Sequence, residues 1–152
     1  MPKKILYILF LCLAIQALAQ HNVHIDATLV PLKKTLSIKQ EITYKNTSAD
    51  TLRELYLFDW ANSFSTKTSP LGQRFAENYN SSFHFEKNED RGKTTIEKIY
   101  GNTLVPLQWQ RGDEVDIIRV IPEKPLLPHN SYTFSLEYAV KLPDSKFTRY
   151  GV

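Results

Sequence analysis

Residues 131–142 read SYTFSLEYAVKL, and this stretch alternates large apolar residues with polar ones along its whole length. Successive side chains of a β-strand point to opposite faces, so an apolar residue at every second position predicts a strand with one buried face. The apolar positions are Tyr132, Phe134, Leu136, Tyr138, Val140 and Leu142. A long half-buried strand is therefore the element from which the fold is built.

The same alternation recurs earlier in the chain. It predicts further strands at residues 23–29, 36–44, 52–58, 94–100, 103–107 and 115–121. Pro31 and the Lys33-Lys34 turn predict that the first two form a hairpin, and Gly101-Asn102 predicts a tight hairpin between 94–100 and 103–107. Seven or eight short strands without long helical periods predict an all-β fold, either an antiparallel β-sandwich or a saddle-like pair of curved sheets.

Residues 61–93 interrupt this alternation of apolar and polar residues. The segment is rich in asparagine, serine and charge, and its apolar residues are scattered. Within it, residues 73–79 predict a short helix and residues 82–85 a short strand. The excursion is long enough to form a surface feature of its own.

The first nineteen residues resemble a cleavable signal-peptide helix. Lys3 and Lys4 form a basic start, and residues 5–15 form an apolar run too short to span a bilayer. Ala17 and Ala19 supply the small residues that a signal peptidase requires, so cleavage is expected before Gln20. The prediction is a signal peptide at 1–19 and one exported β-rich domain at 20–152, located in the periplasm, at the cell surface or outside the cell.

Composition excludes two partner classes. Without Lys3 and Lys4 the chain has 17 basic and 16 acidic residues, so its net charge is about +1. This balance predicts neither a nucleic-acid partner nor a membrane partner after signal cleavage. Cys12, the only cysteine, lies in the predicted signal peptide, so the mature domain has no disulfide and depends on its core for stability.

The histidines do not form a recognisable metal motif. They are His21, His24, His84 and His129, and the sequence has no H-E-x-x-H. His24 and Asp26 share a strand face and could form a weak surface metal site, although a solvated strand is the favoured interpretation. The sequence has no nucleophile turn of the G-x-S-x-G type and no thiol in the mature domain. It therefore predicts no catalytic, metal-ligating or cofactor-binding residue on this chain.

Two tryptophans are the candidate binding residues. Trp60, next to Asp59, and Trp109 could stack on a sugar ring, whereas packing at the rim of the core is the favoured interpretation. Arg111-Gly112-Asp113 spells an adhesion tripeptide but is also typical of a hairpin turn. Asn46-Thr47-Ser48 and Asn80-Ser81-Ser82 match glycosylation sequons and predict surface loops.

Three segments together carry a family resemblance. The first joins ITYKNTS at 42–48 to DTL at 50–52, and the second runs from LYLF at 55–58 to WANSF at 60–64. The third is PLLP at 125–128 before strand 131–142, followed by Pro143 and FTRYG at 147–151. In this order and spacing they resemble the amino-terminal domain of the aminopeptidase N-like gluzincin zinc metallopeptidases, particularly a secreted bacterial branch.

The resemblance implies a role without catalytic residues. In that family the zinc ligands, the general-base glutamate, the amine-binding motif and the transition-state tyrosine lie later in the chain, and none of them maps here. It implies a scaffold and cap domain that docks beside a thermolysin-like catalytic domain and walls its peptide-binding cleft, with zinc in the full-length enzyme. The chain would stop in a connecting loop after Tyr150, as a fragment, and strand 131–142 would be an exposed edge.

A second hypothesis remains open. The chain could be a free-standing exported β-sandwich that binds a glycan or a protein through Trp60, Trp109 or the 61–93 excursion.

Overall fold

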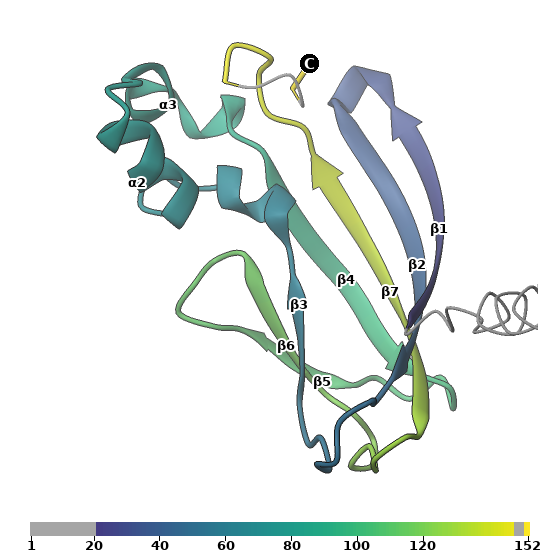
Figure 1. Ribbon diagram of the computed structural model, residues 1–152. Coiled ribbons are helices and arrows are strands. Elements are labelled where there is room, and N and C mark those ends of the chain that lie inside the picture. Colours follow the sequence, from purple (N-terminus) through teal and green to yellow (C-terminus); the bar gives the residue numbers. More distant parts are fainter. Residues whose placement is uncertain (1–20, 148–150) are drawn as a thin grey trace, which may run out of the picture.

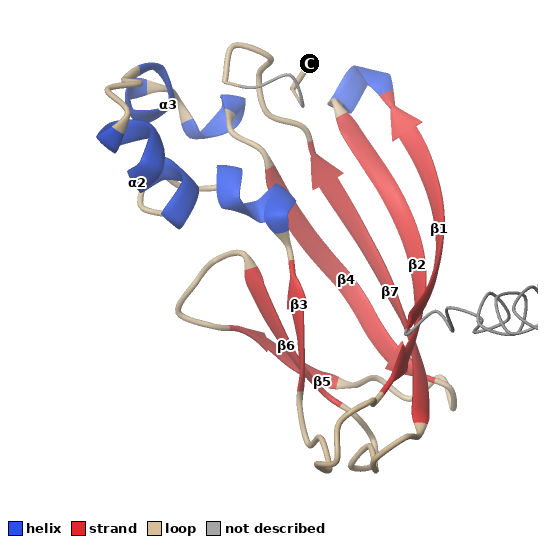
Figure 2. Ribbon diagram, viewed as in Figure 1, coloured by secondary structure: helices blue, strands red, loops and turns tan. Residues whose placement is uncertain are grey.

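The computed structural model describes residues 21–147 and 151–152. Two antiparallel sheets face each other and a group of short helices lies at one end (Figures 1 and 2). The all-β, sandwich-like class predicted from the alternation is confirmed. The predicted signal peptide, with Ala17, Ala19 and Gln20, lies outside the described residues and stays a prediction.

The larger sheet has four strands in the order β1-β2-β7-β4. They are β1 (His21–Val30), β2 (Thr35–Lys45), β7 (Ser131–Lys141) and β4 (Lys93–Gly101). β1 and β2 form the predicted opening hairpin, closed by η1 (Pro31–Lys33) and by Lys34 in a left-handed conformation at φ 50°. The sheet bows so that its hollow side faces the smaller sheet (Figure 1).

The smaller sheet has three strands in the order β3-β6-β5. They are β3 (Leu55–Phe58), β6 (Ile117–Ile121) and β5 (Gln108–Arg111). β3 is shorter than the predicted 52–58, since Leu52 makes only an isolated bridge, to Leu126.

The hydrophobic core lies between the two sheets, where the alternating residues of both inner faces meet. Its buried members are Leu55, Ile99, Leu107, Ile118, Val120, Phe134 and Leu136. Leu136 pairs with Ile99 across β7 and β4, and Leu55 pairs with Val120 across β3 and β6, so each residue is buried because its strand register places it inward.

The hairpin predicted at Gly101-Asn102 is present as a turn with one short stretch of pairing. The Leu104 N–H donates to the Gly101 carbonyl, and Leu104 has a left-handed φ of 60°. Around a single bridge from Tyr100 to Pro106, the Gly101 N–H donates to the Val105 carbonyl and the Leu107 N–H donates to the Ile99 carbonyl. The chain then leaves β4 and enters β5, which pairs with β6 of the other sheet, so the predicted strand at 103–107 is reduced to this bridge.

The 61–93 excursion folds into a small helical lobe with its own core. It contains η2 (Trp60–Phe64), α2 (Pro70–Glu77), α3 (Ser82–Phe85) and η3 (Asn88–Asp90). The helix predicted at 73–79 is confirmed and begins earlier, because Ser69 caps it and Pro70 occupies its first turn. The strand predicted at 82–85 is wrong: this segment is α3, which buries Phe83 against Phe64 and Phe147.

The predicted position of the last strand is also wrong. β7 lies in the middle of the sheet, paired with β2 on one side and β4 on the other. The edges of the larger sheet are β1 and β4, and β7 pairs with β2 along its whole length and with β4 from Phe134 to Lys141.

Candidate functional site

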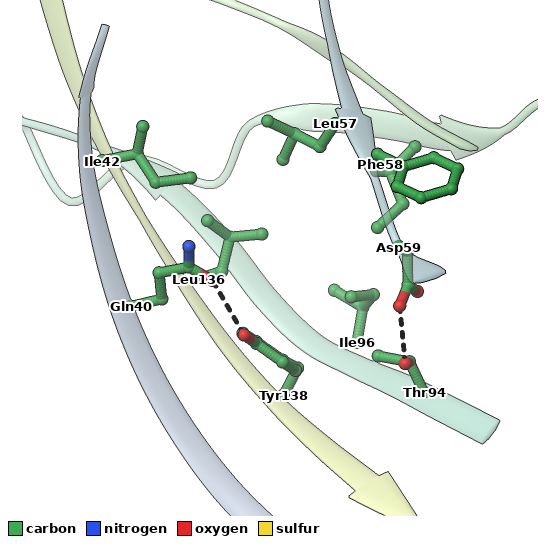
Figure 3. A pocket seen from close by; sticks show the side chains of 10 residues that line it. Gln40, Ile42, Leu57, Phe58, Asp59, Thr94, Ile96, Leu136 and Tyr138 are labelled. Atoms are coloured by element: carbon green, nitrogen blue, oxygen red, sulfur yellow. Dashed lines mark hydrogen bonds between the residues drawn. The ribbon is translucent and has the colours of Figure 1, made fainter. Parts of the chain in front are cut away.

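A groove runs between the two sheets and is the candidate functional site (Figure 3). Its volume is about 150 Å³. One wall comes from β2, β7 and β4, and the other comes from β3 and β6. The lining residues are Gln40, Ile42, Leu57, Phe58, Asp59, Thr94, Ile96, Ile118, Leu136 and Tyr138.

One polar pair lies on the wall formed by the larger sheet. The Tyr138 hydroxyl donates a hydrogen bond of 2.7 Å to the Gln40 side-chain carbonyl (Figure 3). Ile38 is the backbone neighbour of Tyr138 on β2, so this bond runs diagonally to the next inward-facing residue, Gln40. The Gln40 amide nitrogen supplies a donor within an otherwise apolar wall.

The second polar feature joins the sheets where β3 ends. Asp59 accepts from the Thr94 hydroxyl at 2.7 Å and from the Arg111 guanidinium at 2.8 Å. Asn62 donates to the Val115 carbonyl at 2.6 Å and accepts from the Thr94 N–H at 3.0 Å. These four side chains, called here the Asp59 cluster, connect the ends of β3 and β5 to the start of β4.

The Asp59 cluster holds the ends of three strands in place. Each carboxylate oxygen of Asp59 already has a donor, and the side chain is only 9% exposed. Both oxygens of this carboxylate are thus engaged by groups of the same domain. The groove therefore offers apolar contacts and one amide donor, which suits an apolar side chain of a partner.

Asp116 is a buried carboxylate near this cluster. Its Oδ2 accepts from the Ser63 hydroxyl at 2.6 Å, and its backbone carbonyl accepts from the Asp59 N–H at 2.6 Å. Its Oδ1 has no hydrogen-bond partner among the described residues. Sequence reasoning missed this residue, because Asp116 occupies a polar position in the strand predicted at 115–121, where an exposed side chain is expected.

The two candidate tryptophans occupy different parts of the fold. Trp60 begins η2 and packs edge-on against Phe64, with ring centroids 5.1 Å apart. Trp109 lies on the edge strand β5, directly opposite the fully buried Val120. They remain 43% and 38% exposed, so each covers the rim of a core while presenting part of its ring to solvent.

Arg111-Gly112-Asp113 forms the predicted turn between β5 and β6. The Gly112 N–H donates to the Ile117 carbonyl. The Arg111 side chain turns inward to Asp59 and to the Val115 carbonyl, and is therefore engaged within the domain.

A charged group lies on the outer face of the smaller sheet. Glu54 accepts from the Tyr56 hydroxyl at 2.7 Å and from the Arg119 guanidinium at 2.5 Å. The hydrogen bond from Tyr56, followed by that from Arg119, lowers the pKa of Glu54. The same bond raises the pKa of Tyr56, since ionisation would break it.

The first and third resemblance segments meet at Asn46. Its side chain is completely buried, and its amide nitrogen donates to the carbonyls of Asp50, Leu126 and Leu127. Its carbonyl oxygen accepts from the N–H and hydroxyl of Ser48. The prediction that both sequons lie in surface loops is wrong for Asn46, because the turn uses its amide internally. Asn80 lies half-buried between α2 and α3.

His24 and Asp26 do lie on one strand face, as predicted. Their side chains are 3.4 Å apart and both are about three-quarters exposed. Across residues 21–147 and 151–152, no group of three or more His, Cys, Asp or Glu side chains is arranged to hold a metal ion. Over the same ranges, no helix combines the length and apolar character needed to cross a membrane.

The helical lobe presents a second hollow, of about 280 Å³. Tyr79 and Phe85 line it and are 95% and 84% exposed. Beneath it, the buried Arg91 donates to the Phe83 and His84 carbonyls and lies over the Phe83 ring. The aromatic residues of the excursion are thus divided between a buried set and an exposed pair.

Comparisons with known proteins give fold-level likeness only. No protein-family model and no curated protein match this sequence. Among solved structures, a mutant of a two-domain M1 zinc metallopeptidase bound to L-arginine is 14% identical, with a TM-score of 0.47, and the match covers 80% of this chain and 19% of that one. An M1 zinc metallopeptidase mutant from Deinococcus radiodurans, bound to a Tyr-Ser-Ala substrate, is 13% identical with a TM-score of 0.44, covering 82% and 20%. The chain therefore spans about a fifth of the length of these enzymes.

Proposed function

We propose that this chain is a noncatalytic amino-terminal scaffold and cap domain of an exported zinc metallopeptidase of the aminopeptidase type. Peptide hydrolysis belongs to a thermolysin-like catalytic domain further along the full-length protein. Zinc is bound in that domain, where it would activate a water molecule for attack on the peptide carbonyl.

The proposal rests on one observation: polar side chains in the three resemblance segments hold parts of this domain together. Asn46 of the first segment binds Leu126 and Leu127 of the third through its side chain. Asp59 and Asn62, at the second segment, tie β3 to β4 and to the β5–β6 turn. These polar side chains bind groups of their own domain, as expected of residues that maintain a scaffold.

The helical lobe is the surface that this proposal assigns to the catalytic domain. Tyr79 and Phe85 expose most of their rings beside a hollow, and large exposed aromatic residues are typical of contact surfaces. In the longer protein, the double variant Tyr79→Ser with Phe85→Ser should lose this contact, so that the two domains unfold in two separate thermal transitions. If the double variant still unfolds in a single transition at the same temperature as the natural protein, the contact lies elsewhere.

Export is part of the proposal and is tested by mass. Cleavage after Ala19 should leave Gln20 as the first residue of the exported protein, since Ala17 and Ala19 fit the small pockets of the peptidase. Mass spectrometry of the exported protein with residues 1–20 still attached would refute this.

The reading frame of the gene tests the central assignment. We expect the frame to continue past codon 152 and to encode H-E-x-x-H followed by a more distant glutamate ligand. A stop codon there, followed by an unrelated gene, would contradict the proposal and favour a free-standing binding module.

A further inference from the structure

β1 is an unprotected edge of the larger sheet. Its ten residues pair with β2 in one unbroken register, and nine of them are exposed. Natural edge strands are usually blocked by proline, lysine or a bulge. β1 reads HNVHIDATLV and contains none of these. Among the described residues no strand pairs with the far side of β1, so the backbone groups there can accept another strand at this edge of the sheet (Figure 1).

The outer face of this sheet carries a row of alternating charge that ends at β1. Asp26 pairs with Lys39, Lys39 with Glu137, and Glu137 with Lys98, so one row crosses all four strands. The Lys39–Glu137 and Lys98–Glu137 distances are 3.8 and 3.9 Å. At the edge, Asp26 has Lys39 opposite it on β2 and His24 of its own strand 3.4 Å away, and three-quarters of its side chain is exposed.

We propose that a second copy of this chain pairs antiparallel with β1 about a two-fold axis at Ile25. In this register His24 of each copy faces Asp26 of the other. The row then continues from Asp26 of one copy to His24 and Glu41 of the second, because His24 pairs with Glu41 on β2. Opposite partners facing each other across strands stabilise a sheet.

The neighbouring registers lack this complementarity. Moving the axis to residue 24 places His24 against His24, and moving it to residue 26 places Asp26 against Asp26. Two aspartates directly opposite each other repel and destabilise a strand pair, and two histidines opposite each other leave both without an acidic partner. Only the axis at Ile25 joins histidine to aspartate twice.

Apolar side chains on the inner face of β1 also meet in this register. Val23, Ile25 and Leu29 lie on the inner face and are 48%, 53% and 53% exposed, because the smaller sheet does not cover β1. The axis at Ile25 places Ile25 against Ile25 and Val23 against Ala27. The interface uses the same patch twice, so it closes at two copies.

Two single substitutions test this dimer. Asp26→Lys places lysine opposite His24, and His24→Asp places aspartate opposite Asp26, so each variant should dimerise about tenfold more weakly than the natural chain. Mixing the two variants restores His24 opposite Asp26 and places lysine opposite aspartate. Sedimentation velocity should therefore show a heterodimer in the mixture. Because the mixture gains association, misfolding of one variant cannot imitate the result.

Phe85→Ser is the control, since Phe85 is exposed on the helical lobe. It should leave dimerisation unchanged. A natural chain that stays monomeric at its solubility limit would overturn the proposal. So would variants that never form a heterodimer, or association that Phe85→Ser abolishes and Asp26→Lys does not change.

Discussion

Asn46 is the residue on which the turn after β2 depends. Its amide nitrogen donates to three carbonyls, two of them on the segment before β7. Its carbonyl oxygen accepts from the N–H and the hydroxyl of Ser48, so one buried side chain holds several hydrogen bonds that its loss would break. This side chain therefore couples two chain segments that are 80 residues apart.

Asn46→Ala should destabilise the domain by about 2–4 kcal/mol, because it removes these donors from a fully buried position. Urea unfolding measures the change. Asn102→Ala is the matched control, since Asn102 is exposed in the turn after β4, and it should change stability by less than about 0.5 kcal/mol. Equal effects of both substitutions would contradict the role given to Asn46.

Glu54 gives the domain a pH dependence. Hydrogen bonds from Tyr56 and Arg119 lower its folded-state pKa below the ordinary value of 4.5. The resulting stabilisation is complete above the unfolded pKa and is lost as the pH falls through the folded pKa. Urea unfolding of the natural chain and Glu54→Gln should therefore differ at neutral pH and converge in acid. A difference that grows on acidification would contradict this sign.

Several residue roles were not predictable from sequence because they depend on long-range partners. Asn46 reads as a sequon, and its burial follows only from the return of residues 126–127 to the same turn. Arg111 reads as part of an exposed turn, yet it binds Asp59, 52 residues away. A local sequence pattern identifies the turn, but it contains no information about which distant residues contact that turn in the fold.

At the scale of elements, alternation identified most of the paired strands and failed where a segment is short. β1, β2, β4, β6 and β7 follow the predicted period. The strand predicted at 103–107 is a single bridge, β5 at Gln108–Arg111 was not predicted, and four residues around Phe83 were too few to distinguish strand from helix. Strand order was not available from the pattern, so β7 was wrongly expected at an edge.

Gly72 in α2 tests packing at this scale. A Cβ at Gly72 would lie 2.4 Å from the Lys67 carbonyl oxygen, which is backbone and cannot move cheaply. Alanine normally stabilises a helix relative to glycine by about 1 kcal/mol. Here overlap should outweigh that gain, and Gly72→Ala should destabilise the domain by about 1–3 kcal/mol.

Gly112→Ala is the control for Gly72. A Cβ at Gly112 would meet its nearest atom only at 4.0 Å, so thermal unfolding should be almost unchanged. A Gly72→Ala variant that is more stable than the natural chain would contradict this prediction. It would show that the backbone at Lys67 can move away from helix α2 at little cost.

For the whole molecule, the two sheets and the helical lobe form separate cores that share no residue. Phe147, just after β7, packs in the lobe with Phe64 and Phe83, while Phe134 of β7 packs between the sheets. The groove and the Asp59 cluster lie where these two parts meet.

Zinc content tests the central claim most directly. Elemental analysis after dialysis should find no stoichiometric zinc on the purified 152-residue chain and one equivalent on the product of the longer reading frame. One tightly held equivalent on the 152-residue chain itself would contradict the assignment of a noncatalytic domain.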